Sequence, residues 1–377
     1  GITIKAHAVR MNYKALDENI YQFNLIDTPG HVDFSYEVSR SLAACEGAIL
    51  VVDATQGVEA QTVSNLLLAM NNDLVIIPVL NKIDMPSAQV DSVTNQILDL
   101  LGGNKDEILS ISAKSGIGIE EVLEAIVERV PAPNDGQNKP LRALIFDSLY
   151  DQYRGVICFV RVVDGILKKG QKVRFYSTGV VYELEEVGTL VLNRVATPEL
   201  SAGEVGYLTA NIKQLDEAGV GDTIVDERYG EIEPLPGYQP LKAMVFSGVY
   251  PINPEDYEDL RDALERLKLN DAAFSYEPET SPALGFGFRC GFLGLLHMEI
   301  IQERLDREYN VEIITTLPNV RYEVEKRDGD IIEVENPSAL PPTAEIAEVR
   351  EPILSVQILV PSEYIGAVMK ICNERRG

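Results

Sequence analysis

Three short polar sequences stand out because each follows an apolar run that predicts a strand. The first is Asp27-Thr28-Pro29-Gly30-His31, which follows residues 23–26. In a site that hydrolyses phosphates, a carboxylate at a strand end can hold Mg²⁺ through water. Gly30 would offer a backbone N–H to a phosphate with no side chain in the way, and His31 could position the attacking water. An ordinary Pro-Gly turn after a strand explains this stretch equally well.

The other two polar sequences suit the recognition of a guanine base. They are Asn81-Lys82-Ile83-Asp84 and Ser112-Ala113-Lys114. The Asp84 carboxylate can accept hydrogen bonds from guanine N1–H and the 2-amino group, both absent from adenine, and such paired bonds discriminate by roughly 10⁴. Asn81 could reach N7 and support the loop, the stem of Lys82 could cover the purine face, and the Ser112-Ala113 backbone could donate to O6. The alternative is a capped turn after a strand.

Alternating strand and helix patterns in residues 1–134 predict the elements that would carry these sequences. The predicted strands are residues 6–13, 20–26, 48–53, 74–80 and 108–112, and the predicted helices are residues 34–45, 59–70, 87–101 and 120–130. Such alternation is typical of a doubly wound α/β domain. Ligands of these domains bind at the carboxyl ends of the strands, which is where all three polar sequences fall.

The architecture is expected to change after residue 134. Residues 138–228 predict a small all-β barrel, with strands at 141–147, 155–163, 171–176, 180–187 and 206–210. Residues 238–320 predict the β-α-β-β-α-β order of a ferredoxin-like domain, with Asn253 as N-cap of its first helix. Residues 321–350 are charged and contain proline, which indicates a connecting segment. Residues 351–377 predict one strand and one helix, as at the start of a second ferredoxin-like domain.

Composition narrows the class of protein. The chain has 377 residues and a formal charge of -26, which argues against a general electrostatic grip on nucleic acid but leaves room for a local basic patch. Its four cysteines and three histidines show neither a zinc pattern nor a disulfide framework. The sequence has no run of membrane-spanning length and no signal peptide. These features indicate a cytoplasmic protein.

The three polar sequences, in this order, resemble the third, fourth and fifth motifs of the translational GTPases. Gly1-Ile2-Thr3-Ile4 resembles the end of switch I in the same family. The resemblance implies that Thr3 ligates Mg²⁺ through its hydroxyl, that Asp27 holds Mg²⁺ through water, and that Gly30 bonds the γ-phosphate. It also implies that His31 orients the hydrolytic water and that Ile2 is half of an apolar gate in front of it. Pro29 and Lys114 are also residues of these motifs, and the resemblance implies that they contribute to the nucleotide site.

Within that family the chain resembles the LepA branch, also called elongation factor four. Residues 32–46 and 287–299 carry this resemblance, and only about forty residues separate Tyr309 from Glu351, too few for the domain that elongation factor G inserts there. The resemblance implies a monomeric, ribosome-associated GTPase of translation elongation that affects tRNA position and fidelity. It further implies GTP, GDP and Mg²⁺ as ligands, and peripheral contact with the inner membrane besides the cytoplasm. Two alternatives stay open. The chain could be a BipA-like or elongation factor G-like GTPase, or it could be a fragment that binds the ribosome without catalysis or is inert.

One expected motif is missing from the sequence. No Gly-x-x-x-x-Gly-Lys-Ser/Thr occurs in the chain; this loop wraps the phosphates, and its lysine reaches the β- and γ-phosphates. In the family it lies upstream of Gly1 with a central strand, so we expect a fragment with an incomplete GTP-binding domain, also cut before the C-terminal domain. The strands at Ile20 and Ala48 should then have unpaired inner edges. We expect that these residues alone neither bind GTP tightly nor hydrolyse it.

Two further groups of residues suggest weaker hypotheses. His297 lies on an apolar predicted helix and is expected to be a packing or interdomain residue rather than a catalyst. Four arginines could contact ribosomal RNA, although acidic residues lie between them: Arg289, Arg304, Arg307 and Arg321.

Overall fold

The chain forms two compact units, residues 1–318 and 319–377. The computed structural model describes residues 6–31, 34–151, 153–213, 217–230, 232–236, 243–268, 271, 273–317, 320–334, 339–353, 358, 360 and 364–375, apart from the side chain of Tyr36. Within these ranges no helix is long and apolar enough to cross a bilayer.

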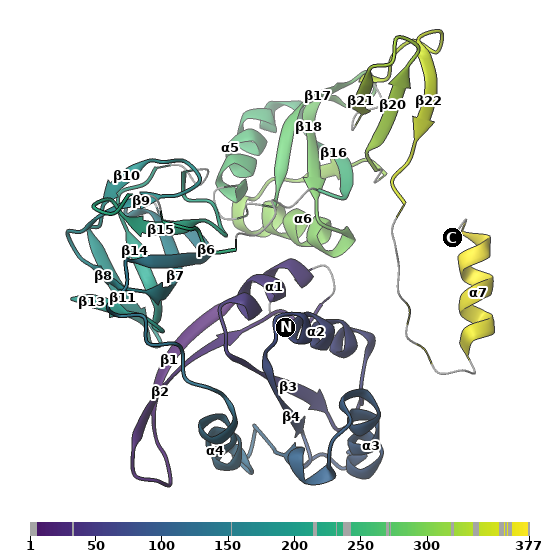
Figure 1. Cartoon of the computed structure of the whole chain (residues 1–377). Coiled ribbons are helices and arrows are strands. Elements are labelled where there is room, and N and C mark those ends of the chain that lie inside the picture. The colour runs from purple at the N-terminus through teal and green to yellow at the C-terminus, as the bar shows by residue number, and fades with distance from the viewer. Residues whose placement is uncertain are drawn as a thin grey trace. The chain divides into compact units, whose positions relative to one another are not determined.

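The first two strands form an antiparallel hairpin, as the two extended segments of the sequence predicted. Strand β1 (His7–Lys14) pairs with β2 (Ile20–Asp27) in a register that runs from His7 opposite Asp27 to Lys14 opposite Ile20. The hairpin turn is closed by the Ala15 N–H, which donates to the Asn19 carbonyl at 3.0 Å. This register places Asp27 at the end of the hairpin away from its turn (Figure 1).

A parallel sheet follows, with helices on both of its faces. Its strands, in the order β3-β4-β5, are β3 (Gly47–Asp53), β4 (Val75–Asn81) and β5 (Leu109–Ser110). Its helices are α1 (Ser35–Ala43), α2 (Ala60–Asn71), α3 (Val90–Leu101) and α4 (Ile119–Arg129), with a short 3₁₀ turn at Lys105–Glu107. On β4, Ile76 and Leu80 pack towards α1, α2 and α3, whereas Ile77 and Val79 pack against α4. The predicted doubly wound pattern is therefore present.

The hairpin and the parallel sheet face each other across a gap between β2 and β3, here called the strand gap. Among the described residues β2 pairs only with β1 and β3 only with β4, so the predicted unpaired inner edges are confirmed. Two cavities of about 550 and 280 Å³ lie between them, lined by both strands. Val51 on β3 is 54% exposed and Ile49 37%, although both are β-branched residues typical of a buried parallel strand.

The barrel region is an antiparallel sheet of eight strands in the order β10-β9-β15-β6-β7-β14-β11-β12, with the small sheet β13-β8 beside it. The strands are β6 (Arg142–Asp151), β7 (Gly155–Asp164), β8 (Ile166–Lys168), β9 (Lys172–Phe175), β10 (Val181–Glu183), β11 (Glu186–Leu190), β12 (Arg194–Thr197), β13 (Glu199–Ser201), β14 (Val205–Thr209) and β15 (Thr223–Asp226). The strand predicted over 180–187 is in fact two strands, because β10 pairs with β9 whereas β11 pairs with β14; Leu184 between them is buried.

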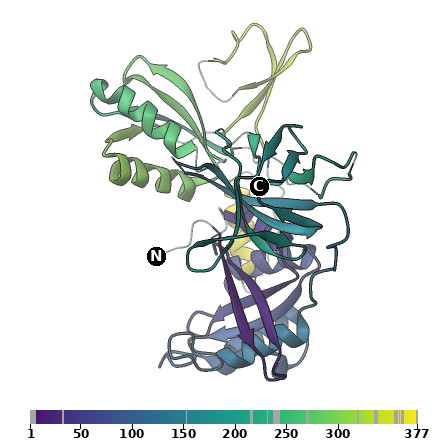
Figure 2. The same ribbon diagram turned by 90° about the vertical axis from the view of Figure 1, so that its left-hand side faces the viewer.

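The next elements have the predicted β-α-β-β-α-β order. They are β16 (Val245–Pro251), α5 (Tyr257–Lys268), β17 (Ser275–Ser281), β18 (Gly285–Phe292), α6 (Leu295–Tyr309) and β19 (Ile313–Thr315), in the sheet order β17-β18-β16-β19. Both helices cover one face of this sheet (Figures 1 and 2). Asn253 was expected to cap the helix, but its side chain donates to the Asp256 carboxylate at 3.2 Å and caps no backbone N–H.

The second unit corrects the expectation of a mere connecting segment at 321–350. A three-stranded antiparallel sheet lies there, in the order β21-β20-β22: β20 (Tyr322–Lys326), β21 (Ile331–Val334) and β22 (Ile346–Arg350). The high charge hid a period-two pattern in which Val324 and Val334 are buried. The helix α7 (Ile365–Glu374) is present. The strand predicted over 351–360 falls partly outside the described residues, and those described, 351–353, 358 and 360, lie in no strand.

Candidate functional site

The loop at the end of β4, residues 81–84, is here called the base loop, and it is tied directly to the turn after β5. The Asn81 side-chain Oδ1 accepts from the backbone N–H of Lys82 at 2.7 Å and from that of Ala113 at 3.0 Å. Lys82 has a positive φ of 65°, a conformation that a side-chain hydrogen bond to the local backbone helps to stabilise. Asn81 thus brings two of the three polar sequences together.

This contact fixes the orientation of the Asn81 carboxamide. Since Oδ1 is occupied by two backbone donors, the amide nitrogen is the end that can donate to a ligand. The same contact also occupies the Ala113 N–H, which was expected to donate to guanine O6. In this structure that donor is already bonded to Asn81, so a base would have to share it.

The turn after β5 is built around Ser112, which is fully buried. Its hydroxyl accepts from the Ser115 N–H at 3.3 Å, and its backbone N–H donates to the Ile117 carbonyl at 3.0 Å. Ser112 was predicted in strand 108–112, but β5 ends at Ser110 and Ser112 makes only an isolated bridge to Ile117. Asp84 and Lys114, on the two joined loops, are exposed to solvent.

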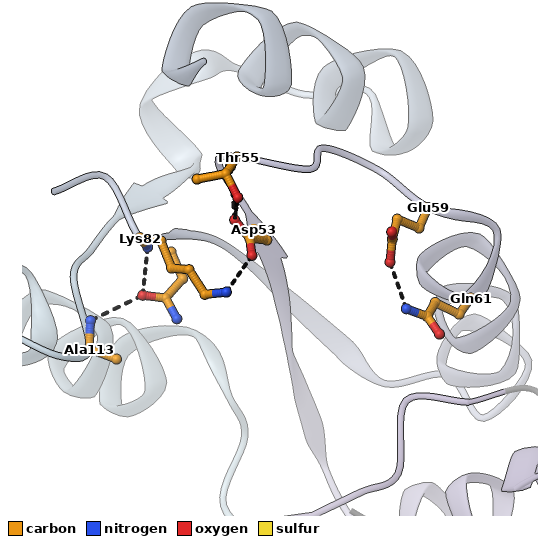
Figure 3. A network of polar contacts seen from close by, with 7 residues as sticks. Asp53, Thr55, Glu59, Gln61, Lys82 and Ala113 are labelled. Carbon is orange, nitrogen blue, oxygen red and sulfur yellow. Dashed lines mark hydrogen bonds and ion pairs between the residues drawn. The ribbon is translucent and has the colours of Figure 1, made fainter. Parts of the chain in front are cut away.

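An acidic residue that the sequence reasoning missed connects the base loop to β3. The Lys82 ammonium donates to Asp53 Oδ2 at 2.5 Å, while Thr55 donates to Asp53 Oδ1 through its N–H at 2.8 Å and its hydroxyl at 2.7 Å (Figure 3). Burial raises the pKa of Asp53, but the bonds from Lys82 and Thr55 outweigh it and hold the pKa below its ordinary value. The signal was available, because Asp53 ends a strand just as Asp27 does.

The Asp27–His31 stretch begins at the last residue of β2 and continues beyond it. Asp27 and Gly30 are exposed, Pro29 is buried and His31 is half-buried. The Gly30 carbonyl accepts from the Asn65 amide at 3.3 Å, and an added Cβ at Gly30 would meet nothing within 4 Å. The His31 ring packs edge-on against Phe34 at 6.4 Å between centroids.

The larger cavity of the strand gap, about 550 Å³, connects this stretch with the end of β3. Residues 27–30 line one side, and Asp53, Gly57 and Glu59 line the other. The base loop does not line it, whereas Asp53 lines it and also contacts Lys82 of the base loop. Ile2 and Thr3 lie outside the described residues. Within the described ranges, no three His, Cys, Asp or Glu side chains gather as a metal-binding group.

Burial and pairing describe the surroundings of His297 and of the four arginines. His297 is 3% exposed; its Nδ1 accepts from the Leu293 N–H at 3.0 Å and its Nε2 lies 2.8 Å from Asp271, so the packing assignment is confirmed. The arginines form no exposed basic patch. Arg289 is buried, and the others pair with acidic side chains, namely Arg304 with Glu308, Arg307 with Glu303 and Arg321 with Glu333.

Comparison with known proteins identifies two domains in the chain. Residues 1–132 match the elongation factor Tu GTP-binding domain and residues 155–225 match elongation factor Tu domain 2. A crystal structure of a Thermus thermophilus protein superposes with a TM-score of 0.64 at 18% identity, covering 86% of this chain and 61% of that one. This likeness concerns the fold alone.

Curated relatives match the whole chain. Elongation factor 4 of Chlorobium phaeobacteroides (strain DSM 266) is 61% identical over all 377 residues, that of Chlorobaculum tepidum 60%, and that of Clostridium novyi 57%. The chain spans 62 to 63% of the length of these relatives. The chain is therefore similar to elongation factor 4 along its entire length, and it carries the two elongation factor Tu domain matches in order.

Proposed function

We propose that the described site binds guanine nucleotides and that the protein hydrolyses GTP to GDP and phosphate on the ribosome during translation elongation. The observation that carries this proposal is the bond from the Ala113 N–H to Asn81 Oδ1, which joins two loops able to read a guanine base. Asp27 and Gly30 lie across the neighbouring cavity, at the strand ends where doubly wound sheets bind ligands.

The base would be read by groups on both loops. The exposed Asp84 carboxylate can accept from N1–H and the 2-amino group, and the Asn81 amide nitrogen can donate to N7. Lys82 would cover one face of the purine with its stem. Ser112, Ala113 and Lys114 form the turn that supports the opposite loop, with the Ala113 N–H shared between Asn81 and the base oxygen.

The described residues supply only part of the proposed Mg²⁺ site. In phosphate sites Mg²⁺ keeps several waters and takes one or two carboxylates together with substrate phosphates, and the exposed Asp27 at the cavity fits such an arrangement. Thr3 would supply a hydroxyl ligand. When bound, the ion would neutralise phosphate charge. Gly30 would donate its N–H to the terminal phosphate, while His31 would hold the attacking water behind a gate that includes Ile2.

The strand gap supports the proposal that a further strand, with a phosphate loop after it, completes the sheet. Two strand edges that have no partner among the described residues face one another across the two cavities, and Ile49 and Val51 are exposed there. We assign residues 1–134 to the GTP-binding domain, 138–228 to the barrel and 238–320 to a ferredoxin-like domain. Residues 351–377 would begin a second ferredoxin-like domain. The 377 residues alone are expected to bind GDP only weakly.

The partner is proposed to be the ribosome, with tRNA nearby, in keeping with relatives called elongation factor 4. The net charge of -26 opposes general attraction to RNA phosphates, so docking would use local surfaces. We further propose that the protein is a monomer in the cytoplasm and that it contacts the inner membrane peripherally.

A fluorescent GDP analogue tests it directly. We define the joined chain as these residues preceded by a strand and phosphate loop from a GTPase of the family. The joined chain should bind the analogue at micromolar or lower concentration, prefer GDP to ADP, and turn over GTP faster with ribosomes; the 377-residue chain should bind weakly. Tight binding by the shorter chain would refute the need for the loop. No ribosome stimulation of the joined chain would argue against a translational GTPase.

A further inference from the structure

We propose that Asp53 is a positioning residue of the nucleotide site, which holds Lys82 in place for the base and links the base loop to the phosphate-side cavity. This inference rests on the proposed guanine-nucleotide function. Its starting point is that Asp53 contacts the base loop and also lines the cavity beside residues 27–30.

The sheet itself brings Asp53 to this position. Asp53 and Asn81 are register partners at the ends of the parallel strands β3 and β4, and the Ala54 N–H donates to the Asn81 carbonyl at 2.9 Å. Lys82, which directly follows Asn81, therefore starts from the strand next to the one that carries Asp53. Strand register, rather than chance contact between flexible side chains, sets the distance that Lys82 spans.

The carboxylate is oriented before it meets the lysine. Its Oδ1 accepts both the N–H and the hydroxyl of Thr55, which leaves Oδ2 for the Lys82 ammonium. The Asp53 side chain is 16% exposed, whereas that of Lys82 is 53% exposed. A fixed, mostly buried acceptor thus holds the end of a long, half-exposed side chain, and Figure 3 shows the Lys82 side chain extending to the Asp53 carboxylate.

Anchoring Lys82 has a consequence for ligand binding. A free lysine loses rotamer freedom when a base packs on its stem, and that loss opposes binding. With both ends held, at a backbone of φ 65° and at Asp53, the stem has already lost much of this freedom. Asp53 therefore favours binding of the purine without touching it.

The same residue gives the site a connection between its two regions. The cavity is lined by Asp53 but not by the base loop, so Asp53 lies between the base loop and residues 27–30 on the phosphate side. An isolated surface ion pair would have little effect on either region, because exposed pairs contribute little energy. The Lys105–Asp91 pair, at 2.9 Å with both side chains largely exposed, is such a case.

A double-mutant cycle in the joined chain tests this role. Asp53→Asn should weaken binding of the fluorescent GDP analogue about threefold to tenfold, a loss of the size expected for a partly buried ion pair. Lys82→Met should weaken it at least as much, and Asp53→Asn added to Lys82→Met should change it less than about twofold, because coupled residues are not additive. Asp91→Asn, the matched exposed carboxylate, should leave affinity unchanged.

Thr55→Val gives a second variant that keeps the Asp53 charge and removes only one of its orienting bonds. It should weaken binding in the same direction and should have no effect in the Lys82→Met background. Full additivity of Asp53→Asn and Lys82→Met, or unchanged affinity in Asp53→Asn, would overturn the positioning role while leaving guanine binding intact. Failure of the unmodified joined chain to bind GDP would instead overturn both proposals.

Discussion

At the scale of single residues, Asp84 is the side chain that should distinguish guanine from other bases. It is exposed at the end of the base loop, and hydrogen bonds to a charged acceptor contribute about 1.5–3 kcal/mol each. Asp84→Ala in the joined chain should weaken GDP binding about a hundredfold, measured by titration with the fluorescent analogue. Asp106→Ala, which removes an exposed carboxylate in the 3₁₀ turn Lys105–Glu107, should leave GDP affinity unchanged. Equal loss in both variants would contradict a base-reading role.

His31 should affect turnover rather than affinity. Its ring lies against Phe34, beyond the cavity-lining residues 27–30, where it could hold water without contacting the base. His31→Ala should lower ribosome-stimulated GTP turnover by the roughly 10²–10⁴-fold typical of lost acid-base positioning. GDP affinity of the joined chain should stay the same, and a parallel loss of affinity would argue for a structural role instead.

Much of this site could be predicted from the sequence because the motif residues follow strands whose apolar runs are plain. The contact between Asn81 and Ala113 could not, since it depends on how two loops meet in space. Asp53 was missed for a related reason: its partner Lys82 is distant in sequence, and only parallel strand register brings them together.

At the scale of elements, the β1–β2 hairpin is held to α4 by one side chain. Glu124 Oε1 accepts from the Tyr13 hydroxyl at 2.6 Å and from the Leu16 N–H at 2.9 Å. The bond to Glu124 favours the protonated phenol and raises the pKa of Tyr13 to about 12. This contact holds the tip of the hairpin against α4.

Glu124→Ala should release that tip. The pKa of Tyr13 should fall back towards its ordinary value, so the phenol would ionise at lower pH, and the Leu16 amide should exchange its hydrogen faster. NMR of ¹³C-labelled tyrosine, assigned with Tyr13→Phe, measures the titration. Glu128→Ala, on an exposed position of the same helix, should leave the pKa unchanged, and an unshifted pKa in Glu124→Ala would refute the anchor.

Long elements were predicted correctly because their periodicity extends over many residues. The helices near 34–45, 59–70 and 120–130 and the strands β3 and β4 are examples. The three-residue strands β8 and β13 were missed, since so few residues cannot show a period. The sheet in residues 321–350 was misjudged because its exposed face is charged, and a charged, proline-containing stretch also suits a connection.

At the scale of the whole molecule, the GTP-binding region and the barrel are joined by ion pairs and a shared apolar cluster. Arg161 on β7 pairs with Glu46, which follows α1, and Arg10 on β1 lies 3.0 Å from Glu204. Ala8 and Ala44 pack with Phe146 and Val205. Burial raises the pKa of Glu46, and the Arg161 charge opposes that rise.

Arg161→Met should make stability depend on pH. Without the guanidinium, the pKa of Glu46 in the folded protein rises further. Above the pKa that Glu46 has in the unfolded chain, the folded state then keeps a proton that the unfolded state releases. The free energy of unfolding therefore falls as the pH increases through this range. We expect a loss of about 2–4 kcal/mol near pH 7.5 and a much smaller loss near pH 5, measured by calorimetry. Arg261→Met, which breaks an exposed pair with Glu258, should cost little at either pH. A loss independent of pH would show that packing, not charge, is responsible.

The edges of β2 and β3, which have no partner within the described part of the chain, also bear on how this chain behaves in concentrated solution. An exposed strand edge is a template for strands of other molecules, and here the β3 edge carries the exposed apolar residues Ile49 and Val51. Self-association of the 377-residue chain should therefore rise steeply with protein concentration despite its charge of -26. A further strand in the strand gap would pair with both edges and remove this tendency to self-associate. The same segment would therefore increase solubility and also supply the phosphate contacts.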